Sequence, residues 1–162
     1  MEPRLLFCDN KKLAGLNIRM SYDENSTVDL WSNFMRRKKE ISNPVSDELI
    51  SLQLFDPGYD FSQVNPQATF EKWACMEVAD FNHIPKGMSP LILPAGLYAV
   101  FTHYGDPARA MFSFNYIFGT WLPASGYQLE NRPHFEVMGA KYKYNAPDSE
   151  EEIWIPVGEK LS

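Results

Sequence analysis

The sequence predicts an α+β fold, in which two duplicated β-α-β-β modules form one antiparallel sheet with two main helices. The order strand, helix, strand, strand occurs twice, and the second copy ends on Glu152 to Trp154 where the first has Glu71 to Trp73. Two such modules side by side place both helices against one sheet. We expect a single domain over residues 1–162, with pseudo-repeats at about 11–80 and 94–158 and a pocket between the halves.

The first module begins after a short N-terminal arm, which we assign to residues 1–10. Loose alternation over Lys12–Met20 predicts a strand. Ser26 or Thr27 can cap the helix that follows, because a hydroxyl there accepts a hydrogen bond from an unpaired backbone amide of the first turn. Apolar residues at helical spacing predict that helix: Leu30, Trp31, Phe34 and Met35. Its basic end, Arg36 to Lys39, has two interpretations, a solvated terminus favoured by the helix dipole or a patch that contacts phosphate.

A break at Asn43-Pro44 separates this helix from two further strands. Leu49–Phe55 is predicted as a strand that ends at the turn signal Asp56 to Gly58, and residues 59–67 as a surface loop. Phe70–Ala79 is predicted as the next strand. Its alternation puts Phe70, Lys72, Ala74, Met76 and Val78 on one side and Glu71, Trp73, Cys75 and Glu77 on the other.

The second module follows a connector that carries His83, Pro85, Gly87 and Pro90. Gly96–Tyr104 is predicted as a strand. Asp106 as N-cap and Pro107 at the first helical position then predict a helix that runs to Trp121. That helix is apolar on more than one side, so it is expected to be covered by protein or to line a cavity.

The chain closes on two predicted strands, Pro133–Gly139 and Glu151–Val157, joined through a polar turn. The two-residue period puts Glu152, Trp154 and Pro156 on one face of the last strand and Ile153, Ile155 and Val157 on the other. The second face is ordinary core. The first face pairs an acid with a large aromatic surface, and such a pair suits an organic cation better than it suits water.

The composition argues against several classes of function. The formal charge of -6 and the pI near 5.0 disfavour a protein held on nucleic acid by phosphate neutralisation, which needs a basic face. Cys8 and Cys75 lie apart without a CxxC, so they indicate neither a zinc site nor a disulfide framework, and Cys75 is expected to be a small buried hydrophobe. The sequence has no secretory pattern and no apolar run long enough to span a membrane. We expect a cytoplasmic protein with no cofactor, metal or direct nucleic-acid partner.

Four stretches of the second half carry a resemblance to a known family. They are Pro94-x-Gly96-x-Tyr98-Ala99-x-Phe101-x-His103-x-Gly105, Trp121-Leu122-Pro123-x-Ser125-Gly126-Tyr127, Pro133-x-Phe135-Glu136, and Glu152 to Val157. In combination they resemble the GyrI-like family, which contains the effector-binding domains of AraC-type and MerR-type multidrug regulators as well as stand-alone proteins. The resemblance implies a duplicated SHS2-type module with a pocket that takes bulky, often cationic aromatic compounds.

The resemblance also implies residues for the pocket. The family's pocket acid lies in the final strand, which maps onto Glu152. The aromatic side chains that would stack on a planar cation are Trp154, Trp73, Tyr98 and Phe101. Tyr127, Trp31, Met35 and Tyr116 are further candidates for its wall or lid, although the three helix residues suit a core at least as well. The alternative for Glu152 is an exposed strand residue paired with Lys141 or Lys143.

Binding by a stand-alone sensor or sequestering domain is the expected activity, since the chain has no spare length for a helix-turn-helix domain. Some members of the family hydrolyse cyclopropane-type electrophiles, and here Glu152 with Tyr98 or Tyr127 would form the reactive pair. His103 is expected to be a hydrogen-bonded structural residue rather than a base. A further alternative is a protein-binding modulator of the gyrase-inhibitor type, whose protein partner the sequence does not identify.

Overall fold

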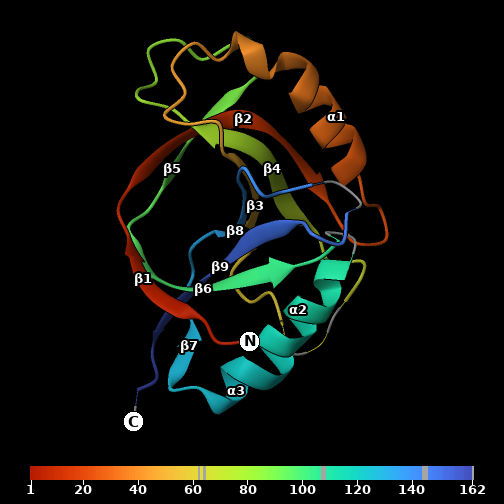
Figure 1. Ribbon diagram of the computed structural model, residues 1–162, viewed down its shortest axis with the longest axis vertical. Helices are drawn as coiled ribbons and strands as arrows, with labels where there is room; N and C mark the ends of the chain where they lie inside the picture. Colours follow the sequence, from red (N-terminus) through yellow and green to blue (C-terminus); the bar gives the residue numbers. More distant parts are fainter. Residues whose placement is uncertain (62, 64, 107–108, 144–145, 162) are drawn as a thin grey trace.

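Two helical segments pack against one face of a curled antiparallel sheet, as the computed structural model of the protein shows (Figure 1). The structure describes residues 1–61, 63, 65–106, 109–143 and 146–161. The elements are β1 (Arg4–Cys8), β2 (Lys11–Met20), α1 (Thr27–Arg37), η1 (Lys38–Glu40), β3 (Leu49–Leu54), β4 (Phe70–Glu77), β5 (Ser89–Leu93), β6 (Gly96–Tyr104), α2 (Ala110–Tyr116), the π-helical η3 (Ile117–Trp121), α3 (Leu122–Ala124), β7 (Tyr127–Leu129), β8 (His134–Met138) and β9 (Glu150–Glu159). The α+β class, the antiparallel sheet and the two main helices are as predicted.

The strand order of the sheet is symmetric about its centre. The order is β1-β6-β9-β8-β3-β4-β2-β5, and β7 pairs with β9 outside this path. On one side of the central β8–β3 pair lie β9 and then β6, and on the other side lie β4 and then β2. Each module therefore contributes its strands in the same spatial order, and the two modules meet where β8 pairs with β3 through Leu52 opposite Phe135.

The two outermost strands correct the sequence prediction. Residues 4–8, assigned to an arm, form β1 and pair with β6 from Arg4 opposite Val100 to Cys8 opposite Gly96. The connector contains β5, which pairs with β2. Each of these strands forms its hydrogen bonds with a strand of the other module, about 74 to 96 residues away along the chain. Local sequence patterns do not report such distant pairing.

The second helical segment also differs from its predicted bounds. Its α-helical part α2 begins at Ala110 with Arg109 as N-cap, and the predicted start at Pro107, on which an Asp106 cap depends, lies outside the described residues. It continues through η3 and α3 to Ala124, past the predicted end at Trp121. Pro123 is the second residue of α3 and follows the π-helical η3 closely.

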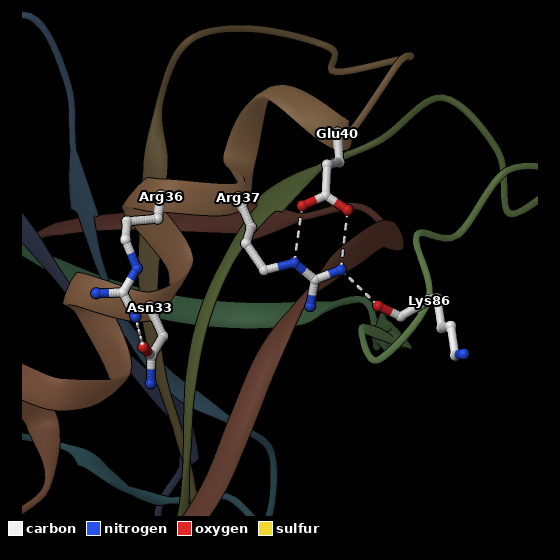
Figure 2. A network of polar contacts seen from close by, with 5 residues as sticks. All are labelled: Asn33, Arg36, Arg37, Glu40 and Lys86. Carbon is white, nitrogen blue, oxygen red and sulfur yellow. Dashed lines mark hydrogen bonds and ion pairs between the residues drawn. The ribbon is translucent and has the colours of Figure 1, made fainter.

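The basic end of α1 is engaged in contacts within the fold (Figure 2). The Arg37 guanidinium donates from Nε and Nη2 to the Glu40 carboxylate, at 2.8 and 2.9 Å, and from Nη2 to the Lys86 carbonyl at 2.5 Å. Arg36 donates to the side-chain oxygen of Asn33. Arg37 thereby ties the end of α1 to the segment that precedes β5, which favours the interpretation as a helix terminus. At the other end of α1, Ser26 is the N-cap but makes no side-chain capping bond.

Three apolar clusters hold the fold together. One fills the inside of the curl with side chains from β1 to β6 and β8, among them Leu13, Trp73, Tyr98 and Phe135, and includes the buried Cys75. A second lies under α1, and a third lies between η3 and strands β6 and β9. Within the described part of the chain, no helix combines the length and apolarity that crossing a bilayer requires.

Candidate functional site

The centre of the helix face carries three desolvated ionisable side chains, Lys72 on β4, Glu136 on β8 and Glu151 on β9, which we call the charged cluster. Helix α1 packs on β2 and β4, and η3 packs on β6 and β9, so the β8–β3 pair runs between the helices. Strand pairing places Ser51 of β3 beside Glu136, and Gln53 beside Lys72. Because paired residues point to the same face, the three charges share the strip between the two helices.

Burial dominates the protonation of the charged cluster. It lowers the pKa of Lys72, against the opposing effect of the two acids, and it raises the pKa of Glu136, against Lys72 and a hydrogen bond from Gln53. Burial and then the Glu136 charge raise the pKa of Glu151 to about 7, while Lys72 lowers it. Lys72 and Glu151 are each 8% exposed, and Glu136 is partly exposed. Near neutral pH, Glu151 is therefore poised between its two charge states.

The charged cluster has few hydrogen-bond partners of its own. Gln53 Nε2 donates to Glu136 Oε1 at 3.4 Å. Over the residues that the structure describes, no hydrogen bond reaches the Lys72 ammonium or the Glu151 carboxylate. A buried charge without such partners is costly, and a bound group that supplies opposite charge removes part of that cost.

Aromatic side chains lie directly beside the charged cluster. Phe61 packs against His134 of β8 and Phe118 of η3, with ring centroids 5.0 Å and 5.2 Å away and interplanar angles of 11° and 19°. The His134 and Phe118 centroids are 6.1 Å apart, so the three rings form a triangle. Burial lowers the pKa of His134 to about 3, so this ring is neutral. His134 and Glu136, two residues apart on β8, share the helix face. We call the following rings the aromatic cluster: Tyr22, Phe55, Tyr59, Phe61, Phe70, Phe118 and His134.

A second observation ties the aromatic cluster to the acids. Burial, and to a smaller extent the charges of Tyr59 and Glu136, raise the pKa of Tyr22 to about 12. The Tyr22 ring packs on Phe70 with centroids 5.2 Å apart, and Phe70 precedes Lys72 on the same face of β4. Aromatic rings and carboxylates thus lie together on one face of the sheet, and this combination suits a flat or bulky aromatic cation.

A hollow of about 800 Å³ opens where β6 ends and α2 begins. His103 lines the hollow and is also the cross-strand neighbour of Glu151. Its Nδ1 lies 2.8 Å from Ser113 Oγ, and its Nε2 lies 3.1 Å from the Asp106 carbonyl oxygen. His103 is thus hydrogen-bonded, as predicted. Within the described ranges, no three His, Cys, Asp or Glu side chains converge as a metal site would require.

The residues predicted for the pocket from the last strand lie on the opposite face of the sheet. Glu152, Trp154, Trp73 and Tyr98 point into the curl, where both tryptophans pack with the inner cluster. Each indole Nε1 donates to the acid two residues earlier, Trp73 to Glu71 at 2.5 Å and Trp154 to Glu152 at 3.3 Å. The two Glu-x-Trp elements are therefore equivalent in structure, as the duplication implies.

Glu152 has a cationic partner within the protein. Its Oε2 lies 2.5 Å from Arg4 Nη2 of β1, and its side chain is 35% exposed. Neither lysine considered from the sequence is that partner, because Lys141 pairs with Glu150 and Lys143 with Asp148. The ligand-binding role of Glu152 stays a prediction.

The Tyr98 ring is fully buried and the Trp154 ring is half-buried. The Tyr98 hydroxyl donates to the Pro133 carbonyl at 2.9 Å, and its side chain is completely buried. Trp154 stacks on Phe135 with centroids 5.2 Å apart. On the helix face, Phe101 is buried against Trp121, which in turn stacks on Tyr127.

The remaining predicted residues are dispersed. Tyr127 pairs with Glu159, which is seven residues beyond Glu152 and about 23 Å along the strand, so the structure does not bring Glu152 and Tyr127 together. The alternative partner for hydrolysis, Tyr98, pairs with Pro156, four residues beyond Glu152. Trp31 and Tyr116 are half-buried against the apolar clusters under their helices, and Met35 is 44% exposed. Their role in ligand binding also stays a prediction.

The charged cluster was not identified from sequence, although two signals pointed to it. Lys72 interrupts the apolar face of a predicted strand, and Glu136 lies within a stretch that carries the family resemblance. Glu151 shares its face with Ile153 and Ile155, the face interpreted as ordinary core. Adjacent acids at 151 and 152 point to opposite faces, so the choice between them decides which side of the sheet carries the site.

The chain is similar to several known proteins. A family model described as integron-associated effector binding protein matches residues 4–157. The transcriptional regulator BrlR of Pseudomonas aeruginosa is 28% identical over 129 residues, and the match covers 79% of this chain and 45% of BrlR. This chain thus spans about half the length of that regulator.

Two solved structures share the fold. SAV2435 bound to tetraphenylphosphonium has a TM-score of 0.76 at 14% identity, with 98% of this chain and 94% of that chain covered. EcmrR in a DNA complex has a TM-score of 0.71 at 18% identity, with 99% of this chain and 58% of that chain covered. At these identities the similarity concerns the fold alone.

Proposed function

The chain belongs to the family of integron-associated effector-binding proteins, and we propose that it binds one bulky aromatic cation at the charged cluster, between its two modules. The observation that carries this proposal is the placement of two desolvated carboxylates, Glu136 and Glu151, beside stacked aromatic rings. The likeness to SAV2435, whose structure holds tetraphenylphosphonium, supports the same class of ligand. Such binding serves a sensing or sequestering role.

The physical basis is the removal of an electrostatic cost. Glu151 is destabilised as a carboxylate by burial and by Glu136, and an organic cation would supply the counter-charge. A delocalised cation loses little hydration on entry, and each ring that contacts it contributes about 0.5 to 2 kcal/mol. Charge pairing and stacking make few directional demands, so we expect several unrelated cations to bind.

The ring of Phe61 marks the place that an aromatic ligand would take. It already packs against both His134 and Phe118 at stacking distance. A ligand ring in the same position would keep both stacking surfaces and would lie over β8, next to Glu136. Binding of this kind requires Phe61 to leave its present position.

The proposal is tested by calorimetric titration of the protein with tetraphenylphosphonium. Glu136→Gln and Glu151→Gln preserve side-chain size and remove one negative charge each, and we expect each to raise Kd by roughly tenfold or more. Glu152→Gln is the matched control on the opposite face, and we expect it to change Kd less than twofold. Loss of binding in Glu152→Gln alone would place the site inside the curl and refute the proposal, as would the absence of binding by the unmodified protein.

A further inference from the structure

The charged cluster contains its own cation. Lys72 lies on β4 in the cross-strand row that continues through Gln53 of β3 to His134 of β8. Its side chain is buried, and both Glu136 and Glu151 act on its charge. A buried lysine is an unexpected residue at a site for cations, because it repels the ligand and competes with it for the acids.

The charges that face Lys72 come from the neighbouring strands. Strand β8 contributes Glu136 and the neutral His134, and β9 contributes Glu151. His103 of β6 lies beyond Glu151 and is hydrogen-bonded to Ser113 of α2. The residues that α1 buries, Leu30 and Phe34, are apolar.

Two carboxylates and one ammonium leave a single negative charge when all three groups are ionised. One added positive charge makes the site neutral, whereas two added charges leave a net positive site that still contains Lys72. Because an uncompensated buried charge is strongly unfavourable, the number of charges on the ligand matters at this position.

We propose that Lys72 is a specificity-determining residue that restricts the site to ligands with one positive charge. The inference rests on the proposed function and adds the charge of the ligand to it. In this role Lys72 lowers the affinity for every cation, and it lowers the affinity for dications most. Without its ammonium the site would hold two negative charges and would accept a second positive charge on the ligand.

Ethidium and propidium provide the test, because they share one phenanthridinium ring system and propidium carries an additional permanent positive charge. Both are titrated into the unmodified protein, Lys72→Met and Lys72→Arg, with dye fluorescence as the readout. We expect the unmodified protein and Lys72→Arg to bind ethidium about tenfold more tightly than propidium. In Lys72→Met, which keeps an unbranched side chain and loses the charge, we expect that preference to fall at least fivefold or to invert.

An ethidium-to-propidium ratio that is the same in Lys72→Met as in the unmodified protein would overturn the proposal, as would equal affinities in the unmodified protein. Lys72→Gln takes the place of Lys72→Met if circular dichroism shows that the latter does not fold. If neither dye binds, or if Glu136→Gln leaves ethidium binding unchanged, the proposed function fails. Ethidium binding that depends on Glu136, together with an unchanged ratio in Lys72→Met, refutes only the role of Lys72.

Discussion

Binding of a permanent cation should weaken on acidification through the titration of Glu151. Burial raises the pKa of this carboxyl to about 7, so it is ionised above that pH and protonated below it. If the ionised form binds the cation, the apparent Kd scales inversely with the ionised fraction. That fraction is about nine tenths at pH 8 and about one tenth at pH 6, so the apparent Kd should rise roughly tenfold between them.

Tetraphenylphosphonium suits this experiment because it has no titrating group. Calorimetric titrations at pH 8, 7, 6 and 5.5 show how the apparent Kd changes with pH. Titrations at pH 7 in two buffers with different ionisation enthalpies give the protons released on binding, and we expect about half a proton because the cation favours the ionised carboxyl. Glu151→Gln is the control, since it leaves Lys72, Glu136 and His103 in place.

Two results would refute the reasoning. An apparent Kd that stays constant between pH 8 and pH 6 would show that Glu151 does not face the bound cation. A pH slope that persists unchanged in Glu151→Gln would assign the dependence to another group. A flat profile in Glu151→Gln combined with the slope in the unmodified protein is the expected outcome.

Three further predictions concern a glycine within the sheet, an aromatic ring at the proposed site and an ion pair on the opposite face. Gly15→Ala should lower the free energy of unfolding in urea by about 3 kcal/mol or more, because the added Cβ would lie 2.1 Å from the Ala74 carbonyl oxygen. A decrease of less than about 1 kcal/mol would contradict the close contact of β2 and β4. Phe61→Ala should leave the affinity for tetraphenylphosphonium unchanged or increase it, since the ligand no longer displaces a ring. A tenfold lower affinity in calorimetry would instead show that the Phe61 ring contacts the bound ligand. Arg4→Ala breaks an ion pair with Glu152 that is largely exposed, so thermal unfolding should report a cost of at most about 1 kcal/mol, and dye binding should not change.

The module order could be predicted from the sequence because each element has a local signature. Leu30 and Phe34 recur at helical spacing and are the residues that α1 buries. Strand alternation correctly separated Lys72 from Trp73, which lie on opposite faces of β4. The repeated Glu-x-Trp element indicated the duplication, and both copies make the same indole-to-carboxylate hydrogen bond.

The edges of the sheet and the second helical segment could not be predicted in the same way. Strands β1 and β5 exist because each finds its partner on the other module, and pairing at that separation leaves no local pattern. The helical segment continues through η3 and α3 and includes Pro123. The sequence rule instead predicts that a helix ends before a proline at that position.

The sequence by itself determined that the last strand carries alternating faces and that an acid on it was a candidate for the site. It did not determine which acid. Glu151 and Glu152 are adjacent, and a one-residue step exchanges the two faces of a strand. Only the tertiary structure decided that Glu152 points into the curl, toward Arg4 of β1, while Glu151 points to the helix face, toward Glu136 and Lys72. The reason is physical: the burial and the partners of each carboxyl come from strands that are distant in the sequence, and a local pattern does not report them.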